Sequence, residues 1–250
     1  MPVTRAVLVT GGSRGIGRAV AQRFADSGDR VAVHYGRRRD DAEQTLASLT
    51  GDGHVLVSAD LADGDAARRL VDDAARALGS LDVLVNNAGV FVAHPPATSS
   101  WEHWQSVWSQ TVAVNLTAAA HATFAAVPHL QRTRGAVVNV SSRGAFRGEP
   151  QCPAYAASKA GLNAFGQSMA VALAPLGIGV ATVAPGFVET DMAREVLDGP
   201  EGDAVRAQSP FGRVARADEV AAAVFWLASV EARFASGTIV DVNGASYLRS

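Results

Sequence analysis

The sequence predicts an α/β fold, in which a mostly parallel sheet of about seven strands carries helices on both faces. Short runs rich in β-branched residues, of which Ala6–Thr10 is the first, alternate with helical segments along all 250 residues. This alternation is typical of doubly wound sheets, because parallel strands need crossover helices between them. No long linker, internal repeat or low-complexity tract interrupts the pattern, so we expect one domain over residues 1–250.

The composition is that of a globular enzyme and argues against several other classes. Hydrophobic residues make up 48% of the chain and charged residues 18%, which is ordinary for globular proteins. The net charge of -2 argues against a nucleic-acid partner, which would require a basic face. We expect no membrane span and no signal peptide, and hence a cytoplasmic protein. The single cysteine, Cys152, excludes an internal disulfide framework.

The first strand leads into a glycine-rich turn and then into a helix predicted over Arg18–Ser27, which Gly28 ends. This context binds dinucleotides, because glycines let the backbone approach a pyrophosphate and the helix N-terminus offers free N–H groups. The spacing differs from G-x-G-x-x-G, and the alternative is a generic tight turn. We predict a Rossmann-like cofactor site formed by Gly11, Ser13, Arg14, Gly15, Ile16 and Gly17.

The second strand, Arg30–Tyr35, bears on the choice of cofactor. Many NAD sites place a carboxylate at the end of this strand, where it binds the ribose hydroxyls. Here that end is not acidic, Arg37-Arg38-Arg39 follows it, and Arg14 already lies in the glycine turn. Arginines suit a ribose 2′-phosphate, so we predict NADP(H), with Arg14 and Arg37 near that phosphate. The alternative for the arginine run is a solvated basic turn.

The next two strands, predicted over His54–Ser58 and Leu81–Val85, end in further candidates. Helices are predicted before and between them, over residues 41–49 and 63–78. Asp60 and Leu61 follow the first of these strands, where Asp60 could meet an adenine amine or cap a helix N-terminus. The second is followed by small and amide residues that would let the chain pass close to a ribose, namely Asn86, Asn87, Ala88 and Gly89.

A long and mostly helical segment is predicted over Ser100–Val127. Its tryptophans at 101, 104 and 108 form one stripe at helical spacing, which favours a core or oligomer face over a ligand cage. Asn115 interrupts an apolar stretch. A buried amide needs hydrogen-bond partners, so Asn115 is either structural or part of a polar relay.

The acid–base candidates lie on the strand Ala136–Val140 and on a helix predicted over Pro153–Ala174. Tyr155 and Lys159 are four residues apart, on one face of that helix. Lys159 is the sole lysine among 22 basic residues. Its ammonium would lower the phenol pKa from about 10, so that Tyr155 can exchange a proton with a substrate. Ser142, just beyond the strand, would hold the carbonyl oxygen; the alternative for the Tyr/Lys pair is a solvated helix face.

The last part of the chain completes the sheet and supplies a lid. A strand over Val180–Ala184 runs into Pro185-Gly186-Phe187-Val188-Glu189-Thr190. The segment Thr190–Phe211 has mixed charge and no sustained apolar period, and we interpret it as a mobile substrate lid. A helix over residues 218–229 and a strand over 238–242 follow. The strand ends would gather at one edge of the sheet, where ligands bind in such folds.

The chain resembles one family, the short-chain dehydrogenases/reductases, from end to end. The motifs that carry the resemblance occur in the expected order: Thr10-Gly11 with Gly15-Ile16-Gly17, Asn86-Asn87-Ala88-Gly89, Asn115, Ser142, Tyr155 with Lys159, and Pro185-Gly186. The resemblance implies that Tyr155 donates or accepts the proton and that Ser142 orients the substrate oxygen. It also implies that Lys159 holds the nicotinamide ribose and lowers the Tyr155 pKa, and that Asn115 joins a water-linked proton relay.

The same resemblance assigns cofactor contacts and an assembly. It places Asp60 at the adenine, and Val188 and Thr190 at the nicotinamide half, beyond Pro185 and Gly186. It links Arg14 to NADP preference, and it implies a homotetramer built on the helices from Ser100 and Pro153. No metal is expected. Within the family the chain is most similar to 3-oxoacyl-acyl-carrier-protein reductases, over residues 179–192 and 212–244. The implied activity is NADPH-dependent reduction of a ketone to a secondary alcohol.

Departures from those reductases leave alternatives open. Leu176 replaces a basic carrier-docking residue, although Arg132 and Arg134 could serve instead. Val242-Asn243-Gly244-Ala245 replaces the usual Asp-Gly-Gly, and Arg143 is large and charged where a small residue is frequent. A stand-alone ketoreductase, or an alcohol or sugar dehydrogenase of the family, is therefore the close alternative. A non-catalytic nucleotide sensor on the same fold is disfavoured, because the Ser/Tyr/Lys set is complete.

Overall fold

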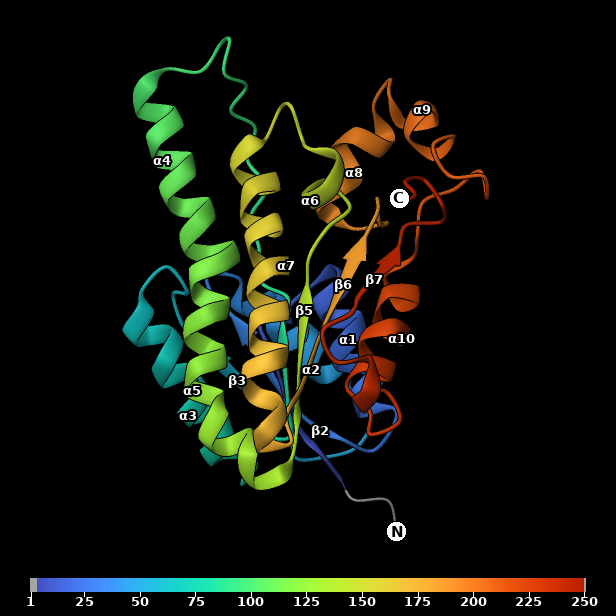
Figure 1. The fold of residues 1–250 in the computed structure, drawn as a ribbon. Helices are drawn as coiled ribbons and strands as arrows, with labels where there is room; N and C mark the ends of the chain where they lie inside the picture. The colour runs from blue at the N-terminus through green and yellow to red at the C-terminus, as the bar shows by residue number, and fades with distance from the viewer. Residues whose placement is uncertain (1–3, 250) are drawn as a thin grey trace.

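The computed structural model describes residues 4–249 and contains one sheet of seven strands in the order β3-β2-β1-β4-β5-β6-β7. Every neighbouring pair of strands is parallel, as the alternating pattern predicts (Figure 1). The strands are β1 Ala6–Val9, β2 Arg30–Tyr35, β3 Val55–Ser58, β4 Val83–Asn86, β5 Ala136–Val140, β6 Gly179–Pro185 and β7 Ile239–Val242.

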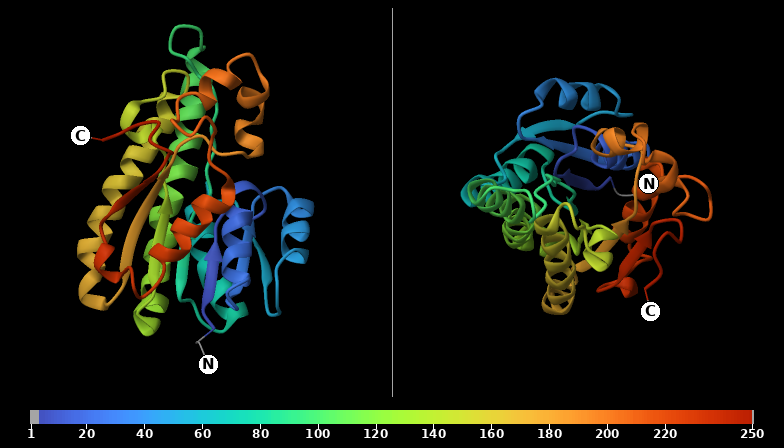
Figure 2. Two further views of the ribbon diagram at one scale, coloured as in Figure 1. Left: turned by 90° about the vertical axis from the view of Figure 1, so that its right-hand side faces the viewer. Right: turned by 90° about the horizontal axis from the view of Figure 1, so that it is seen from above.

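Helices cover both faces of this sheet (Figure 2). One face carries α3 (Gly64–Leu78), α4 (Trp101–Val112), α5 (Ala118–Thr133) and α7 (Pro153–Leu173), and the other carries α1 (Gly15–Ala25), α2 (Arg39–Ala47) and α10 (Ala217–Leu227). No helix within residues 4–249 is both long and apolar enough to span a membrane.

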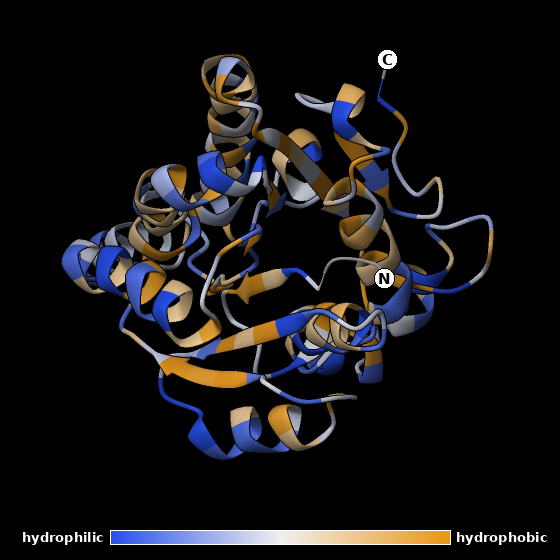
Figure 3. Ribbon diagram, turned by 90° about the horizontal axis from the view of Figure 1, so that it is seen from below, coloured by the Kyte–Doolittle hydropathy of each residue, from blue (hydrophilic) through white to orange (hydrophobic). Residues whose placement is uncertain are grey.

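The core consists of two apolar clusters, one on each face of the sheet. Neighbouring residues of β1 show how the strands feed both of them: Ala6 and Leu8 belong to one cluster, and Val7 and Val9 to the other. Successive strand residues point to opposite faces, so a strand buried on both sides reads as a continuous apolar run. Figure 3 shows hydrophobic residues gathered on the central strands and hydrophilic residues toward the outside of the helices.

Two helix starts show how local sequence sets the boundaries. Asp63 caps α3, and its carboxylate accepts hydrogen bonds from the backbone N–H groups of Asp65 and Ala66 at 2.9 and 3.3 Å. Helix α1 begins at Gly15, three residues before the predicted start. The last two glycines of the turn therefore lie in the first turn of the helix, where their N–H groups are free to face a ligand.

The long helical segment differs from the prediction in the middle and at its end. A π-helical turn, Ala113–Thr117, separates α4 from α5, and α5 continues to Thr133. Asn115 lies in this turn. Trp104 and Trp108 pack with their ring centroids 5.8 Å apart, whereas Trp101 is 65% exposed. The tryptophans thus divide between a packed pair and a free surface position.

The segment predicted as an irregular lid contains two short helices, α8 (Asp191–Asp198) and α9 (Gly202–Arg206). Their apolar side chains form a small cluster of their own, with Ala193, Leu197, Val205 and Val214 at its centre. Helix α9 is too short to display a helical period, whereas the apolar residues of α8, Met192, Ala193, Val196 and Leu197, do recur at helical spacing and were overlooked in the sequence. A third short helix, α6 (Gly144–Arg147), follows β5, where no helix was predicted.

Candidate active site

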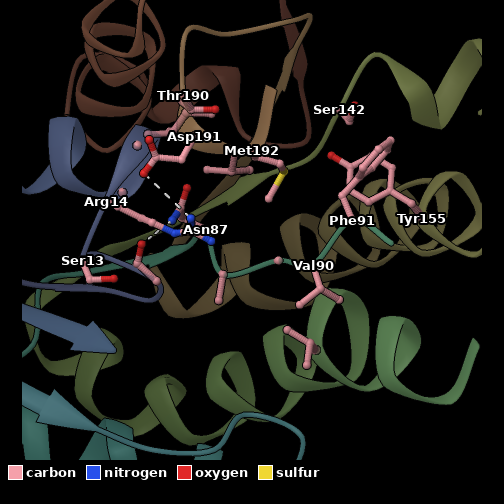
Figure 4. A pocket seen from close by; sticks show the side chains of 18 of the residues that line it. Ser13, Arg14, Asn87, Val90, Phe91, Ser142, Tyr155, Thr190, Asp191 and Met192 are labelled. Carbon is pink, nitrogen blue, oxygen red and sulfur yellow. Dashed lines mark hydrogen bonds and ion pairs between the residues drawn. The ribbon is translucent and has the colours of Figure 1, made fainter. Parts of the chain in front are cut away.

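The carboxyl ends of the central strands surround a cavity of about 680 Å³, a volume typical of cofactor and substrate sites. Figure 4 shows its two ends: Ser13, Arg14, Thr190 and Asp191 lie at one, and Phe91, Ser142 and Tyr155 at the other. Every predicted cofactor residue and all predicted catalytic residues but Asn115 line it, namely Gly11, Ser13, Arg14, Gly15, Ile16, Gly17, Arg37, Asp60, Leu61, Asn87, Ala88, Gly89, Ser142, Tyr155, Lys159, Pro185, Gly186, Val188 and Thr190.

The glycine turn is a backbone cradle in which side chains do not fit. Gly11 adopts φ 61°, a left-handed conformation, and a Cβ there would lie 2.9 Å from Cα of Ala88. A Cβ on Gly17 would collide with the carbonyl oxygen of Gly11 and lie 2.6 Å from Nδ2 of Asn87. Asn87 in turn donates from Nδ2 to the Thr10 and Gly11 carbonyl oxygens, at 2.9 and 3.0 Å. Glycine is therefore required by packing as well as by conformation.

His34 supports this cradle, and sequence reasoning missed it. Its Nδ1 accepts the Gly11 N–H at 3.0 Å, so the ring proton is on Nε2, 3.2 Å from the Ala59 carbonyl oxygen. The side chain is 2% exposed, and burial lowers the pKa of His34 to about 4. In the sequence, position 34 attracted notice only because the end of this strand lacks the carboxylate of many NAD sites. The available signal was a polar residue at the end of an otherwise apolar strand.

Charged groups cluster at the end of the cavity predicted to hold the ribose phosphate. Arg14 lies 3.9 Å from Asp191, and Arg38 lies 3.5 Å from Asp41. Arg37 has no carboxylate within 4.0 Å among residues 4–249 and is exposed. One arginine at this end is therefore available to an anion without first breaking an ion pair.

Asp60 lines the cavity but does not cap α3. Its Oδ1 accepts the backbone N–H of Ala62 at 3.0 Å, whereas Asp63 takes the N-cap position. The helix-cap alternative for Asp60 is therefore wrong. Asp60 and Leu61 both line the cavity.

Tyr155 lies beside Ser142, and the predicted direction of its pKa shift is wrong. Burial raises the pKa of the phenol to about 12, although a hydrogen bond with Ser142 acts to lower it. Phe91 packs edge-on against the ring, with centroids 4.8 Å apart. The removal of water from the phenolate thus outweighs stabilisation by neighbouring groups.

Lys159 lies near the Tyr155 ring, but its hydrogen bond goes to the backbone of β5, and its effect on the phenolate stays a prediction. Its Nζ lies 5.8 Å from the centroid of the Tyr155 ring and donates to the Val140 carbonyl oxygen at 2.7 Å. The residue is 3% exposed, and burial lowers the pKa of the amine to about 8. The Lys159 amine is therefore buried, and its hydrogen bond is to the last carbonyl oxygen of β5.

Asn115 lies behind the cavity wall, with its amide satisfied by the chain. Oδ1 accepts from Val90 N at 2.8 Å, and Nδ2 donates to Val90 O at 3.0 Å and to Ser158 Oγ at 3.1 Å. These bonds give it a structural role. Asn115 and Lys159 nevertheless flank Gly89, where a Cβ would lie 3.5 Å from Oδ1 of the first and Nζ of the second. The proton relay stays a prediction.

Comparison with known proteins agrees with this arrangement. A family model described as short chain dehydrogenase matches residues 5–201. The chain belongs to this family. It is 34% identical over 251 residues to a 3-oxoacyl-acyl-carrier-protein reductase of Staphylococcus aureus, with 99% of this chain and 100% of the relative covered. It is also 34% identical to 3beta-hydroxysteroid dehydrogenase 1 of Eggerthella lenta, with 98% and 94% covered.

One solved structure resembles this dehydrogenase in both sequence and fold. A short chain dehydrogenase from Burkholderia cenocepacia, in complex with NADP, superposes with a TM-score of 0.88 and 38% identity, and 97% of each chain is covered. The predicted family, fold and enzyme class are therefore confirmed: the protein is an oxidoreductase of this family.

The proposed carrier-docking arginines lie far from the cavity within one subunit. Arg132 is in the last turn of α5 and Arg134 follows it, just before β5 begins at Ala136. The cavity is at the other end of β5, beside Ser142. Five strand residues span roughly 16 Å, so these arginines do not line the cavity entrance of their own subunit.

Proposed function

We propose that this dehydrogenase reduces a ketone, either a 3-oxoacyl thioester or a similar carbonyl, to a secondary alcohol with NADPH. The observation that carries the proposal is the meeting of Ser142, Tyr155 and Lys159 at one end of a cavity whose other end is the glycine cradle. The cradle fits a dinucleotide, because side chains are excluded at Gly11 and Gly17 where the backbone must approach phosphates. When bound, NADPH would supply the hydride.

The residues at the substrate end divide the remaining work. The Ser142 hydroxyl holds the carbonyl oxygen, and Tyr155 gives that oxygen its proton as it becomes an alkoxide. A phenol with a pKa of about 12 is protonated at neutral pH and therefore has a proton to give. The buried amine of Lys159 places a positive charge near the proton transfer. After the transfer it can give a proton back to Tyr155.

We infer a preference for NADP(H) over NAD(H). Arg14 and Arg37 line the end of the cavity next to β2, and His34, Tyr35 and Gly36 leave that strand end without a carboxylate. A ribose 2′-phosphate would find two guanidinium groups there. The NADP complex of the Burkholderia relative supports the same choice.

The segment Thr190–Phe211 is proposed to act as the lid over this site. A Cβ on Gly15 would lie 3.2 Å from the Thr190 side chain, and Asp191 lies 3.9 Å from Arg14. The start of the lid thus touches the cofactor end, while its small apolar cluster is separate from the main core. Segments with few core contacts open most readily, which supports closure over bound ligands.

A homotetramer is proposed for the assembly. Trp101, Phe124 and Val171 are 65%, 76% and 79% exposed and lie on α4, α5 and α7, the helices expected to pair between subunits. Large exposed apolar side chains on neighbouring helices favour an interface. Light scattering should give a particle near four times 25.9 kDa; a stable 25.9 kDa particle at micromolar concentration would refute it.

The experiment that tests the proposed reaction is a panel assay of NADPH oxidation. The panel contains 3-oxoacyl groups on a carrier protein, the same groups on coenzyme A, simple ketones and sugars. We expect turnover with one or more ketones and a secondary alcohol as product. A carrier requirement would favour the 3-oxoacyl-carrier reading, and equal rates with free thioesters or ketones would favour a stand-alone ketoreductase. No oxidation with any carbonyl would contradict the proposal and favour a nucleotide sensor.

A further inference from the structure

A second cavity, of about 370 Å³, adjoins the first. Arg143 and Phe187 line both of them, so the two spaces meet at these side chains. The rest of the second cavity is formed by the end of the lid segment, the loop before α10 and its first turn, and the end of β7 with the chain after it, including Ser209, Phe211, Arg213, Glu219, Asn243 and Ser246. The second cavity therefore extends the substrate end of the active site away from the glycine cradle.

Arg143 is a buried cation whose hydrogen-bond partners are neutral. It is 3% exposed. Nη1 donates to Ser246 Oγ at 2.6 Å, Nη2 donates to Gln208 Oε1 at 2.9 Å, and the guanidinium lies 5.4 Å from the centroid of the Phe187 ring. No carboxylate within residues 4–249 lies within 4.0 Å of it. Burial lowers the pKa of Arg143.

The other charges around the second cavity are paired. Arg213 lies 2.7 Å from Glu219, and Asp241 lies 2.7 Å from Arg249. Arginine is rarely this deeply buried without a carboxylate partner, because removing its charge from water is costly. Two neutral oxygens offset only part of that cost, and the guanidinium has five N–H donors, more than these two bonds use. The position therefore favours an anionic ligand.

Arg143 is also fixed next to the proposed reaction centre. It follows Ser142 directly, and its backbone N–H donates to the Pro185 carbonyl oxygen at 2.8 Å. Glu149, the nearby carboxylate in the first cavity, lies 3.9 Å from Arg147. The carboxylates that line the second cavity, Glu219 and Asp241, are likewise paired with arginines, so among its charged lining residues Arg143 is the one without a carboxylate within 4.0 Å in residues 4–249. We propose that the second cavity holds the end of the substrate that lies away from its ketone, and that Arg143 binds a carboxylate there. This proposal rests on the proposed ketone reduction.

A purely structural role for Arg143 is the competing account. Gln208 belongs to the lid segment and Ser246 to the C-terminal segment, so the guanidinium also ties these two together. Loss of such a tie would weaken binding of every substrate alike. Loss of a carboxylate partner would weaken binding of charged substrates selectively.

The test compares keto acids with their methyl esters. The probes are 4-oxopentanoate, 5-oxohexanoate and 6-oxoheptanoate, each beside its ester, with kcat/KM measured at saturating NADPH. In the wild type we expect the acid-to-ester ratio to peak at one chain length. Arg143→Met should lower that peak ratio by about tenfold or more, the scale of a hydrogen bond to a charged group.

Arg147→Met is the matched control. Arg147 is the last residue of the short helix α6, whose N-cap is Arg143, and its Nη1 is 3.4 Å from the same Gln208 oxygen, but it lines neither cavity. The acid-to-ester ratio should be kept in this variant. A ratio that is equal in wild type and Arg143→Met, with both probes slowed alike, would overturn the proposal and leave Arg143 as a structural tie.

A binding measurement separates this inference from the proposed reaction. Calorimetric titration of 5-oxohexanoate into the enzyme with NADP should show affinity in the wild type and about tenfold weaker affinity in Arg143→Met, whether or not turnover occurs. Binding without reduction would refute ketone reduction and retain the carboxylate subsite. Affinity unaffected by Arg143→Met would refute the subsite.

Discussion

The two ends of the active-site cavity are built in different ways. At the cofactor end the backbone determines the shape: Gly11 and Gly17 leave no room for a side chain, and Asn87 ties β4 to the turn. At the substrate end the determinants are side chains, namely the half-buried Tyr155 and the buried Lys159 and Arg143, close to the short helices α6 and α8. The cofactor end therefore depends on backbone geometry. The substrate end depends on the free-energy cost of burying charged or titratable side chains.

Gly17→Ala should have the largest effect and tests the backbone half of this comparison. The added methyl group would collide with the Gly11 carbonyl oxygen, and a collision with backbone cannot be relieved by a rotamer change. We expect NADPH affinity to fall by about 100-fold or more, or the protein to fail to fold, by fluorescence titration and circular dichroism. Gly179→Ala is the control, since its nearest atom would be 3.7 Å away. Normal NADPH affinity in Gly17→Ala would mean that the cradle is not rigid.

Lys159→Met tests the substrate end, where a charge is buried for function. The folded-state pKa of about 8 lies below the ordinary 10.5, so the cost of charging this amine is fully present below pH 8 and disappears as pH rises through 10.5. Replacement by an apolar side chain should therefore raise the free energy of unfolding at pH 7 by about 1–2 kcal/mol, after allowance for the lost hydrogen bond. Turnover should fall about 100-fold.

Those two effects are measured by thermal or urea unfolding and by steady-state kinetics. If Lys159→Met is destabilised at pH 7, the buried ammonium is better compensated than its contacts indicate. If turnover stays at the wild-type level, the amine plays no part in the reaction.

The side chain of His34 supports the backbone of the glycine cradle, and its contribution to the free energy of unfolding depends on pH. Its folded-state pKa of about 4 lies below the ordinary 6.5, so the unfolded chain takes up the proton first. Stability should decline as pH falls from about 6.5 to 4, by roughly 3 kcal/mol from this residue. His34→Gln should remove that part of the pH dependence, whereas the exposed His103→Gln should not. A pH profile that is the same in wild type and His34→Gln would contradict the assignment.

Arg37→Ala tests the part of the cofactor end that depends on side-chain charge, beside the expected ribose phosphate. Loss of a charge-assisted hydrogen bond should raise the Michaelis constant for NADPH about tenfold and that for NADH much less. Arg14→Ala should act in the same direction but more weakly, because Asp191 already lies 3.9 Å from that guanidinium. Equal wild-type efficiency with NADPH and NADH would remove the inferred preference.

Every residue that the sequence assigned to the cofactor lines one cavity with the Ser142, Tyr155 and Lys159 set, and their roles there stay predictions. Gly11 and Gly17 are predictable because no other residue fits their positions, and the parallel sheet follows from the alternating pattern. The π turn around Asn115 was missed because its residues suit an ordinary helix equally well. The support from His34 was missed because its partner is a backbone N–H at residue 11, 23 positions away in the sequence.

The pKa of Tyr155 marks the main limit of sequence reasoning. The four-residue spacing from Lys159 correctly brought the two side chains to one cavity, but the sign of the shift depends on how much water the fold removes around the phenol. Residue spacing carries no information on that quantity. The same holds for Arg143, whose burial could not be anticipated from a loop position.

The most direct test of the account is the turnover number of Tyr155→Phe on any ketone that the wild type reduces. The substitution keeps the ring and its edge contact with Phe91 and removes the proton. Turnover should fall by about 100-fold or more, with NADPH affinity retained because the glycine cradle is intact. Tyr35→Phe, the same chemical change outside the cavity, is the control. Near-wild-type turnover in Tyr155→Phe, with hydride transfer shown to be rate-limiting, would contradict the assignment of Tyr155 as the proton donor.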